Sequence, residues 1–528
     1  MTNLTKLEQE LRAGRLSRRD FLQATTALGL GAVVPSILST AHAAPKPGGK
    51  MTVGLGHGST TDSLDPGTYE NDFTIGSSFA RFNFLTEISN TGELVGELAE
   101  SWDVTPDAKE WTFKLRSGVE FHNGQSLTAE DVVNSINHHK GEESTSAAKP
   151  IVDPIVDIKA DGDTVTFVLE AGNADFPFLV SDYHLAIMPT KDGKPDWESA
   201  AGTGPYMQES YEPGVNLKLK RNPNYWKQSA AHFDEAELIV IADVGARTNA
   251  LNTGEVDMMD RCDIKTLHLL QRNKNVVIEE ISGNGHYTIP MRTHLEPFND
   301  NNVRLALKYA LDRELMLQTV LGGHGSVGND HPIGSGQRYY AADLPQKSYD
   351  PDKAKFHLKE AGLSSLDVDL SAADAAFSGA VDAAQIYQEN AAKAGININV
   401  IREPADGYWS NVWNTDNRGW CFSYWGGRPT EDWMFATAYA SGASWNESAW
   451  EHEEFNKLLN AARSELDEGK RRDMYVEMQR LCSDEGGSIV PLFNNYIHAI
   501  STKVAHEENM ATNWANDGHR YLERWWFA

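Results

Sequence analysis

A segment rich in aromatic, glycine and charged residues lies between positions 423 and 435. Arg428 is its single basic residue, and the planar guanidinium of an arginine can bind a carboxylate or a phosphate through two parallel hydrogen bonds. Alternatively, Arg428 pairs with Glu431 or Asp432 on its own loop. The segment therefore predicts either an anion-binding site or a local ion pair.

The residues just before Arg428 are typical of a ligand-contacting surface. Tyr424 and Trp425 follow two apolar residues, and Gly426 and Gly427 would let the backbone approach a ligand closely. For Trp425 we favour stacking on a ligand over burial in the core. These four residues extend the candidate site around Arg428.

Trp409 and Trp413 are four positions apart, so we expect them to share one face of a helix. That spacing is more typical of packing than of ligand binding. The remaining candidates are polar or aromatic residues after the first predicted strand and near residue 290, and each can equally be a turn, a cap or a surface pair: His57, Asp62, Tyr287 and Arg292.

The sequence lacks the local motifs of common hydrolases. It has neither Gly-x-Ser-x-Gly nor His-Glu-x-x-His. His138 and His139 are adjacent, so on a helix their side chains would point about 100° apart and make a poor metal pair. The seventeen histidines are scattered, which argues against a carrier of metal or haem, and we expect no metal and no cofactor. A secreted hydrolase with dispersed carboxylates stays an alternative, because such carboxylates leave no local motif.

Charge and cysteine content limit the partners. The 528 residues carry a formal net charge of −28. Binding to a nucleic acid requires a basic face, so we expect no nucleic-acid partner. Cys262, Cys421 and Cys482 do not have the spacing of a metal site, and we expect buried thiols, with a Cys421–Cys482 disulfide as the alternative. The length suggests about two to four domains.

Residues 1–43 have the pattern of a twin-arginine export signal. Arg18 and Arg19 precede Phe21 and Leu22, and a short, weakly apolar run leads to an Ala-x-Ala site that ends at Ala43. The run is short for a bilayer span of ~20 residues, although an uncleaved anchor is the alternative. We therefore expect a mature chain that starts near residue 44, in the periplasm.

The pattern of apolar residues predicts a mixed α/β protein with more strands in its first half and more helices in its second. The predicted strands span residues 50–55, 111–116, 163–169, 215–220, 275–281 and 488–493. The predicted helices begin at residues 128 and 247 or span 302–311, 313–321, 351–361, 453–466 and 470–482. Residues 366–370, 379–394 and 396–401 form a β-α-β unit, which requires a parallel strand pair.

Six segments in order give the chain a family resemblance. They are residues 62–66, 113–124, 128–132, 202–206, 221–226 and 302–307. Together they resemble the peptide-type extracytoplasmic solute-binding proteins of ABC importers, from about residue 49 to the end of the chain.

The resemblance implies a two-lobed α/β periplasmic-binding-protein fold of type II, in the large variant with an extra subdomain and with the ligand cleft between the lobes. Lobe I would comprise residues 49–80, 203–290 and 492–528, with an inserted subdomain at 81–202, and lobe II residues 291–491. The chain would cross between the lobes near Pro290 and Pro491.

The resemblance also implies a function. The protein would close on a small polar solute without transforming it and, as a monomer, deliver it to membrane permease subunits. In peptide-binding relatives an aspartate at the position of Arg428, counted from Trp425, pairs with the ammonium of the peptide. An arginine cannot do so, which suggests an acidic ligand such as an amino-acid conjugate, an opine-like acid or an acidic peptide. Glu431 or Asp432 can restore ammonium binding if the register shifts, and an oligosaccharide or a metal complex stays an alternative ligand.

Overall fold

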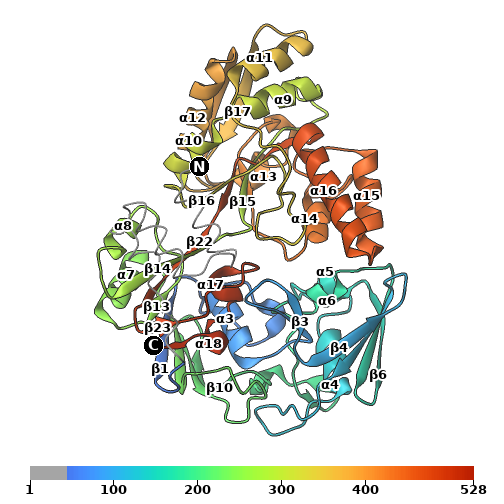
Figure 1. Ribbon diagram of the computed structural model, residues 1–528, viewed down its shortest axis with the longest axis vertical. Helices are drawn as coiled ribbons and strands as arrows, with labels where there is room; N and C mark the ends of the chain where they lie inside the picture. Colours follow the sequence, from blue (N-terminus) through green and yellow to red (C-terminus); the bar gives the residue numbers. More distant parts are fainter. Residues whose placement is uncertain (1–44) are drawn as a thin grey trace, which may run out of the picture.

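The computed structural model describes residues 45–528, which form the two halves visible in Figure 1. The predicted export signal at residues 1–43 lies outside these described residues. We use lobe I for the half that contains the seven-stranded sheet and lobe II for the half that contains the parallel strand pair; the residue boundaries given above stay a prediction. Within residues 45–528, none of the helices has the length and the apolar character that a bilayer crossing requires.

Lobe I is built on a mixed sheet whose seven strands come from distant parts of the chain. In spatial order these strands are β10 (Tyr206–Glu212), β11 (Asn216–Arg221), β12 (Glu235–Val240), β1 (Lys50–Leu55), β13 (Met258–Met259), β22 (Tyr496–Ser501) and β14 (Val276–Ile281). The central strand β1 pairs in parallel with β12 and β13. Alternation along β1 buries Met51, Val53 and Leu55 in the core of this lobe.

Two helices pack against this sheet. The helix α3 (Asp72–Arg81) packs against β10 and β12, and α7 (Val244–Thr253) packs against β1 and β13. Asn71 caps α3 by accepting hydrogen bonds from the backbone N–H groups of Phe73 and Thr74, at 3.1 Å each. The cap fixes the start of α3, where Asp72 lies.

An antiparallel four-stranded sheet forms the inserted subdomain, on the right of Figure 1. Its order is β4 (Ala99–Val104), β5 (Glu110–Leu115), β7 (Thr164–Leu169) and β6 (Ile155–Asp161). The predicted alternating strands are confirmed as β5 and β7, and they bury Phe113 and Phe167 in one core. The helix α4 (Ala129–Asn137), predicted to begin at residue 128, packs against the sheet and begins with a capping box of Thr128 and Asp131.

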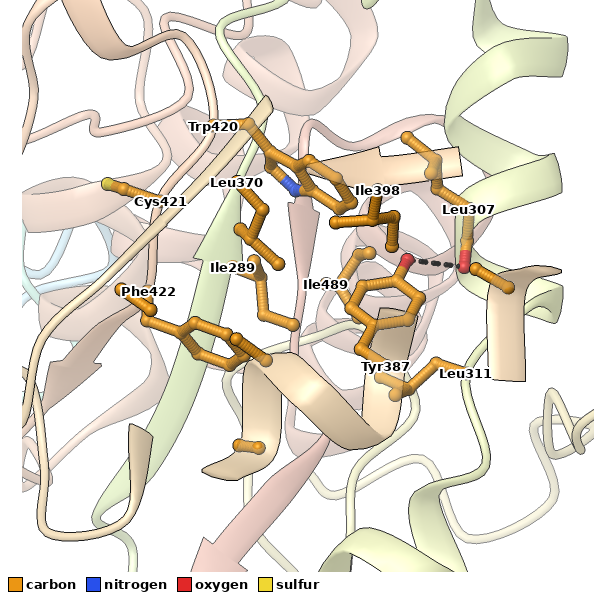
Figure 2. Packing of buried hydrophobic residues seen from close by; sticks show 14 of the residues in the cluster. Ile289, Leu307, Leu311, Leu370, Tyr387, Ile398, Trp420, Cys421, Phe422 and Ile489 are labelled. Atoms are coloured by element: carbon orange, nitrogen blue, oxygen red, sulfur yellow. Dashed lines mark hydrogen bonds between the residues drawn. The ribbon is translucent and has the colours of Figure 1, made fainter. Parts of the chain in front are cut away.

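Lobe II contains the predicted β-α-β unit. Strands β17 (Leu366–Ala372) and β18 (Ile396–Arg402) pair in parallel, and α12 (Ala380–Ala392) connects them. Figure 2 shows the core around this unit, where the rings of Tyr387 and Trp420 meet edge to face at 5.4 Å. The Tyr387 hydroxyl donates a hydrogen bond to the Leu307 carbonyl at 2.7 Å and so satisfies its own polar group in the core.

Helices predicted from apolar periodicity make up much of the rest of lobe II. They are α9 (Asn301–Tyr309), α10 (Arg313–Val320), α11 (Pro351–Glu360), α15 (Glu453–Ser464) and α16 (Glu468–Glu485). Their ends agree with the predictions to within a few residues. Gly362, directly after the cap of α11, has a φ of 76°, a left-handed conformation typical of the glycine that ends a helix.

The chain passes between the lobes in two segments that lie side by side. One segment leads from β14 in lobe I to β15 (His286–Pro290) in lobe II, and the other leads from β21 (Leu492–Asn494) in lobe II back to β22 in lobe I. On the lobe I side β14 pairs with β22, and on the lobe II side β15 pairs with β21 and with β20 (Ser488–Ile489). Between them Gly283 lies against Asn494, so closely that a Cβ on Gly283 would stand 2.3 Å from the Asn494 carbonyl oxygen. Both connections therefore pass through one narrow place at the centre of the molecule.

The other elements are short. They are β2 (Thr86–Ile88), β3 (Leu94–Gly96), α5 (Lys149–Val152), α6 (Phe176–Leu179), β8 (Thr190–Lys191), β9 (Lys194–Pro195), α8 (Leu267–Leu270), β16 (Gly325–Val327), α13 (Tyr408–Asn411), β19 (Ser423–Trp425), α14 (Glu431–Ala438), β23 (Val504–Ala505), α17 (Ala515–Gly518), α18 (Tyr521–Arg524) and β24 (Trp526–Phe527). The three cysteines are free and buried, as expected, and the alternative disulfide between Cys421 and Cys482 is wrong.

Candidate functional site

A cleft of about 480 Å³ separates the lobes beside the two connections. Lobe II contributes the consecutive residues Tyr424, Trp425, Gly426 and Gly427 to its wall. Lobe I contributes residues from four separate segments: Asp72, 260–262, Ile264, 495–497, Ala515 and Asn516. Gly285 and Asn494 of the two connections complete the lining. Four of the predicted ligand contacts thus lie in one cavity between the lobes.

The lobe II wall is held in place by β19. This strand pairs with β15, so Trp425 lies opposite His286 and Tyr424 lies opposite Tyr287. Gly427 then packs against the adjoining connection, where a Cβ would stand 2.7 Å from the Cβ of Asn284. A Cβ on Gly426 would meet nothing closer than 3.9 Å. Only Gly427 is therefore required to be glycine by close packing.

The Arg428 guanidinium is half-buried and has no carboxylate partner among residues 45–528. It donates hydrogen bonds to the carbonyls of Gly426 and Gly427, at 3.2 and 3.3 Å, and lies 5.7 Å from the ring centre of Trp425. Burial lowers its pKa, while the nearby Tyr183 of the inserted subdomain opposes that shift. The guanidinium keeps donors for an anion.

The alternative ion pair on the Arg428 loop is wrong. The Glu431 carboxylate accepts a hydrogen bond from the backbone N–H of Tyr339 at 2.8 Å. The Asp432 carboxylate pairs with Arg463 at 3.1 Å. Both acidic residues are buried in these contacts, so a shift of register to either one is also disfavoured.

Trp425 belongs both to the cleft wall and to a buried cluster. Its side chain is buried, and its indole N–H donates a hydrogen bond to a Glu447 oxygen at 3.0 Å. The same carboxylate accepts from the Trp413 indole at 2.6 Å and from the Thr288 hydroxyl at 2.7 Å. Burial raises the pKa of Glu447, and these hydrogen bonds oppose the shift. Glu447 therefore fixes both indoles against β15; stacking of Trp425 on a ligand stays a prediction.

The rings of Trp409 and Trp413 are in contact, but the predicted explanation, that both residues lie on one face of a helix, is wrong. Their rings meet edge to face at 5.8 Å. The helix α13 ends at Asn411, so Trp413 lies beyond it. Asn414 follows with a φ of 55°, which continues no right-handed helix. A single turn, rather than a helix, brings the two indoles together.

Lobe I places charges of both signs at the cleft. The Asp72 carboxylate pairs with Arg261 at 3.2 Å and with His519 at 3.4 Å. Burial alone would raise the pKa of Asp72, but His519 and Arg261 lower it below its ordinary value. Burial and the Asp72 charge raise the pKa of Asp260 to about 7. Burial likewise raises the pKa of Cys262 to about 12, which disfavours a reactive thiolate.

The four secondary candidates have structural contacts. The Asp62 carboxylate accepts from the Ser59 backbone at 2.8 Å and holds the turn before α3. Tyr287 stacks on Phe377 at 3.7 Å. The Arg292 guanidinium pairs with Asp416 at 2.8 Å. None of these three lines the interlobe cleft.

His57, the fourth secondary candidate, reaches the cleft only indirectly. Its imidazole lies 3.5 Å from the Asp72 carboxylate, which itself lines the cavity. Burial and the Arg261 charge lower the pKa of His57. His57 is thus a neighbour of the lobe I wall.

Asp72, Asp260 and Arg261 were not identified from the sequence. Asp72 begins α3, and the other two residues follow β13, almost 190 positions later. The helix cap at Asn71 could have located the start of α3, but no local signal shows that this end of the helix faces lobe II. Glu447 was not identified either, because its hydrogen-bond partners Thr288, Trp413 and Trp425 lie 159, 34 and 22 positions away in the sequence.

Two further cavities lie between lobe II and the inserted subdomain. A smaller cavity of about 60 Å³ is lined by Pro429, Thr430 and Glu431 of lobe II, by residues 512–514, and by Phe178, Leu179, Ser181 and Asp182 of the subdomain. A further cavity of about 320 Å³ lies between Trp433 of lobe II and the core of the subdomain. Arg428 is flanked by Gly427, which lines the main cleft, and by Pro429, which lines the next cavity.

One group of carboxylates has the spacing of a metal site but is already neutralised. Glu87, Glu97 and Glu523 lie close together. Lys227 pairs with all three, at 3.1 Å for Glu97 and 2.6 Å for Glu523. Arg520 pairs with Glu97 at 2.8 Å and with Glu523 at 2.7 Å. The cluster is a buried salt-bridge network that joins the inserted subdomain to lobe I.

Comparison with known proteins places this geometry among binding proteins. The family description "Bacterial extracellular solute-binding proteins, family 5 Middle" matches residues 93–447. The chain is 26% identical over 515 residues to the dipeptide-binding protein of Escherichia coli strain K12, covering 90% of this chain and 94% of that one. It is 25% identical over 551 residues to the periplasmic oligopeptide-binding protein of the same organism, covering 95% of each.

Solved structures share the architecture. HbpA2 from Haemophilus parasuis superposes with a TM-score of 0.78 at 21% identity, covering 87% of this chain and 96% of that one. The periplasmic binding protein DppA from Helicobacter pylori, in complex with a peptide, has a TM-score of 0.69 at 21% identity and covers 92% of this chain and 99% of that one. These similarities confirm the predicted two-lobed α/β fold.

Proposed function

Because the chain belongs to the bacterial extracellular solute-binding proteins of family 5, we propose that it captures a peptide-like or amino-acid-derived solute with an acidic group and delivers it to the permease of an ABC importer. Its relatives are named as binding proteins for dipeptides and oligopeptides. We further propose that the solute is acidic, that the chain is exported by the twin-arginine route and that the mature protein is a monomer.

The observation that carries the proposal is the state of Arg428. Its guanidinium is half-buried beside the ring of Trp425, which lines the cleft, and none of the described carboxylates pairs with it. Partial removal from water strengthens a pairing between a guanidinium and a carboxylate. The two acidic residues that follow are engaged with Tyr339 and Arg463. An acidic group of the solute is the partner that this arrangement fits best.

The fold supports capture by closure. Trp425 of the cleft wall belongs to lobe II, whereas Asp72 and Arg261 of the opposite wall belong to lobe I. A solute that contacts both walls stabilises the arrangement in which the lobes meet, and a permease can distinguish that arrangement from the open one. The solute leaves unaltered in this proposal.

Location and assembly complete the proposal. The twin-arginine pattern at residues 1–43 would direct the folded chain to the periplasm, in line with the name of the periplasmic oligopeptide-binding relative. The mature protein would act as a monomer.

A matched series of compounds tests the charge preference. Dialanine, N-acetyl-dialanine and N-succinyl-dialanine share the C-terminal carboxylate, and at the N-terminal end they carry an ammonium, a neutral amide and an added carboxylate, respectively. We expect N-succinyl-dialanine to bind the purified protein tightest, because its carboxylate can pair with Arg428. Replacement of Arg428 by Asp should weaken that binding by about 10- to 100-fold and improve binding of dialanine, as expected when one charged hydrogen bond is lost.

Thermal unfolding provides the first screen and calorimetry the dissociation constants. A compound at about 100 times its dissociation constant adds roughly 2.7 kcal/mol to the free energy of unfolding. Arg463→Gln is the matched control, because Arg463 is engaged with Asp432. Tighter binding of dialanine than of N-succinyl-dialanine by the unmodified protein would contradict the acidic-solute proposal.

A further inference from the structure

Five aromatic rings form a continuous surface on lobe II, which we call the aromatic wall: Tyr424, Trp409, Trp413, Trp425 and Trp445. Successive ring centres in this order lie 5.6, 5.8, 6.4 and 5.9 Å apart. These spacings are typical of interacting aromatic pairs. The wall is thus one surface built from three separate chain segments.

Three of the five rings of the wall are open to solvent, whereas Trp413 is half-buried and Trp425 is buried. Trp409 is 41% exposed, Tyr424 50% and Trp445 49%. Of the large aromatic residues that are exposed in residues 45–528, only Phe356 lies outside the wall. An apolar surface with several exposed aromatic rings, on an otherwise acidic protein, is typical of a binding surface.

The inner part of the wall is rigid. Glu447 accepts hydrogen bonds from the indole N–H groups of Trp413 and Trp425, at 2.6 and 3.0 Å, and the Thr288 hydroxyl on β15 holds the same carboxylate. These contacts orient the two central rings before any ligand arrives. A pre-ordered aromatic surface loses little conformational entropy on binding.

The wall is continuous with the interlobe cleft, because Tyr424 and Trp425 line both. We infer that the aromatic wall is a second subsite of the cleft, and that it takes an aromatic or flat apolar side group of the same solute whose acidic group meets Arg428. The inference rests on the proposed function and narrows the solute class to acidic compounds with such a side group. The short path along the wall from Arg428 supports this occupant, since the guanidinium lies 5.7 Å from the Trp425 ring centre.

Calorimetry with three probes tests the inference: N-succinyl-Ala-Ala, N-succinyl-Ala-Phe and N-succinyl-Phe-Ala. We expect one of the two phenylalanine compounds to bind at least tenfold tighter than N-succinyl-Ala-Ala. Trp445→Ala and Trp409→Ala should each reduce that gain and leave the dissociation constant for N-succinyl-Ala-Ala within about twofold of its original value. The variant Phe356→Ala is the control, because Phe356 is equally exposed but lies on α11, outside the wall.

Four outcomes would count against the inference. Equal binding of all three probes, or tryptophan variants that bind every probe like the unmodified protein, would overturn it and leave the wall as a contact surface for a protein partner. Equal weakening of all probes by a tryptophan variant would assign the wall a structural role only. If no succinyl probe binds, the proposed function itself fails and the inference falls with it.

Discussion

Burial shifts the pKa values of Arg428 and Glu431 in opposite directions. Burial lowers the pKa of Arg428, but an arginine starts so high that its guanidinium remains charged at neutral pH. Burial raises the pKa of Glu431 to about 6, and the nearby Asp175 adds to the shift. The segment that starts α14 therefore combines a permanent cation with a carboxylate that titrates close to neutral pH.

The raised pKa of Glu431 predicts a dependence of stability on pH. Because the folded-state pKa lies above the ordinary value of 4.5, the contribution of Glu431 to stability is fully present below pH ~4.5 and is lost as the pH rises through about 6. As the pH rises from 4 to 8, ionisation of Glu431 should lower the free energy of unfolding by about 2 kcal/mol.

The variant Glu431→Gln should remove that cost, since its amide oxygen can still accept from the Tyr339 backbone. In urea unfolding, we expect the free energy of unfolding of Glu431→Gln to rise by about 2 kcal/mol relative to that of the unmodified protein as the pH increases from 4 to 8. A constant difference between the two proteins over this range would contradict the assigned shift.

The sequence identified the lobe II residues of the cleft but not their partners. Arg428 and Trp425 stand out because their types and spacing are local features. The bond from Trp425 to Glu447 spans 22 positions, and that from Asp432 to Arg463 spans 31. Such pairings depend on how elements pack, so the ion pair expected at Arg428 could not be tested before the fold was known.

Elements with strong local signals were predicted best. The capping box at Thr128 and the glycine after α11 each fix a helix end through a hydrogen bond or a φ value that only nearby residues determine. The β-α-β unit was predicted because its apolar periods are regular. The short helix α13 was not, because its end at Asn411 is followed by a left-handed residue that spacing alone does not reveal.

At the element level, the packing of β19 against the interlobe connection predicts different roles for two adjacent glycines. A Cβ at position 427 would stand 2.7 Å from Asn284, whereas one at position 426 would meet nothing closer than 3.9 Å. We expect Gly427→Ala to lower the free energy of unfolding by about 1–3 kcal/mol, as overpacking does. Gly426→Ala should stay within about 0.5 kcal/mol of the unmodified protein.

Denaturant unfolding of the two alanine variants measures this difference. The pair is well matched, because both substitutions add one methyl group at neighbouring positions of the same loop. Equal stabilities for the two variants would show that the connection yields to accommodate a side chain at position 427.

For the whole molecule, contacts between the inserted subdomain and lobe II hold the lobes together. The Arg471 guanidinium of α16 pairs with the Asp175 carboxylate at 2.6 Å, and both are buried. Beside this pair, the Ala174 backbone N–H donates to the Arg463 carbonyl at 2.7 Å. The buried network around Lys227 in turn fixes the subdomain to lobe I. Opening of the cleft must therefore break the pair of Arg471 and Asp175.

Replacement of Asp175 by Asn should shift the protein toward an open form. It leaves the Arg471 charge buried without its partner in the closed arrangement, at a cost of up to about 3–5 kcal/mol, and opening lets water solvate the guanidinium. We expect small-angle scattering to show a larger radius of gyration for Asp175→Asn without solute. Glu477→Gln is the control, since Glu477 pairs with Arg480 within the same helix; an identical radius for both variants would show that this pair does not hold the lobes.

The two-lobed arrangement as a whole could be expected only from the family resemblance. Periodicity predicts individual strands, but the seven-stranded sheet takes strands from residues 50 to 501. Which distant strands become neighbours is set by packing of the entire chain, and a single sequence carries little direct information about it.

Calorimetric titration of the purified protein with N-succinyl-dialanine, followed by mass spectrometry of the recovered compound, tests the central claim most directly. We predict a single site per chain, loss of most of the affinity in Arg428→Asp, and recovery of the compound with its mass unchanged. Hydrolysis of the compound, or the same affinity with and without the Arg428 guanidinium, would contradict the account.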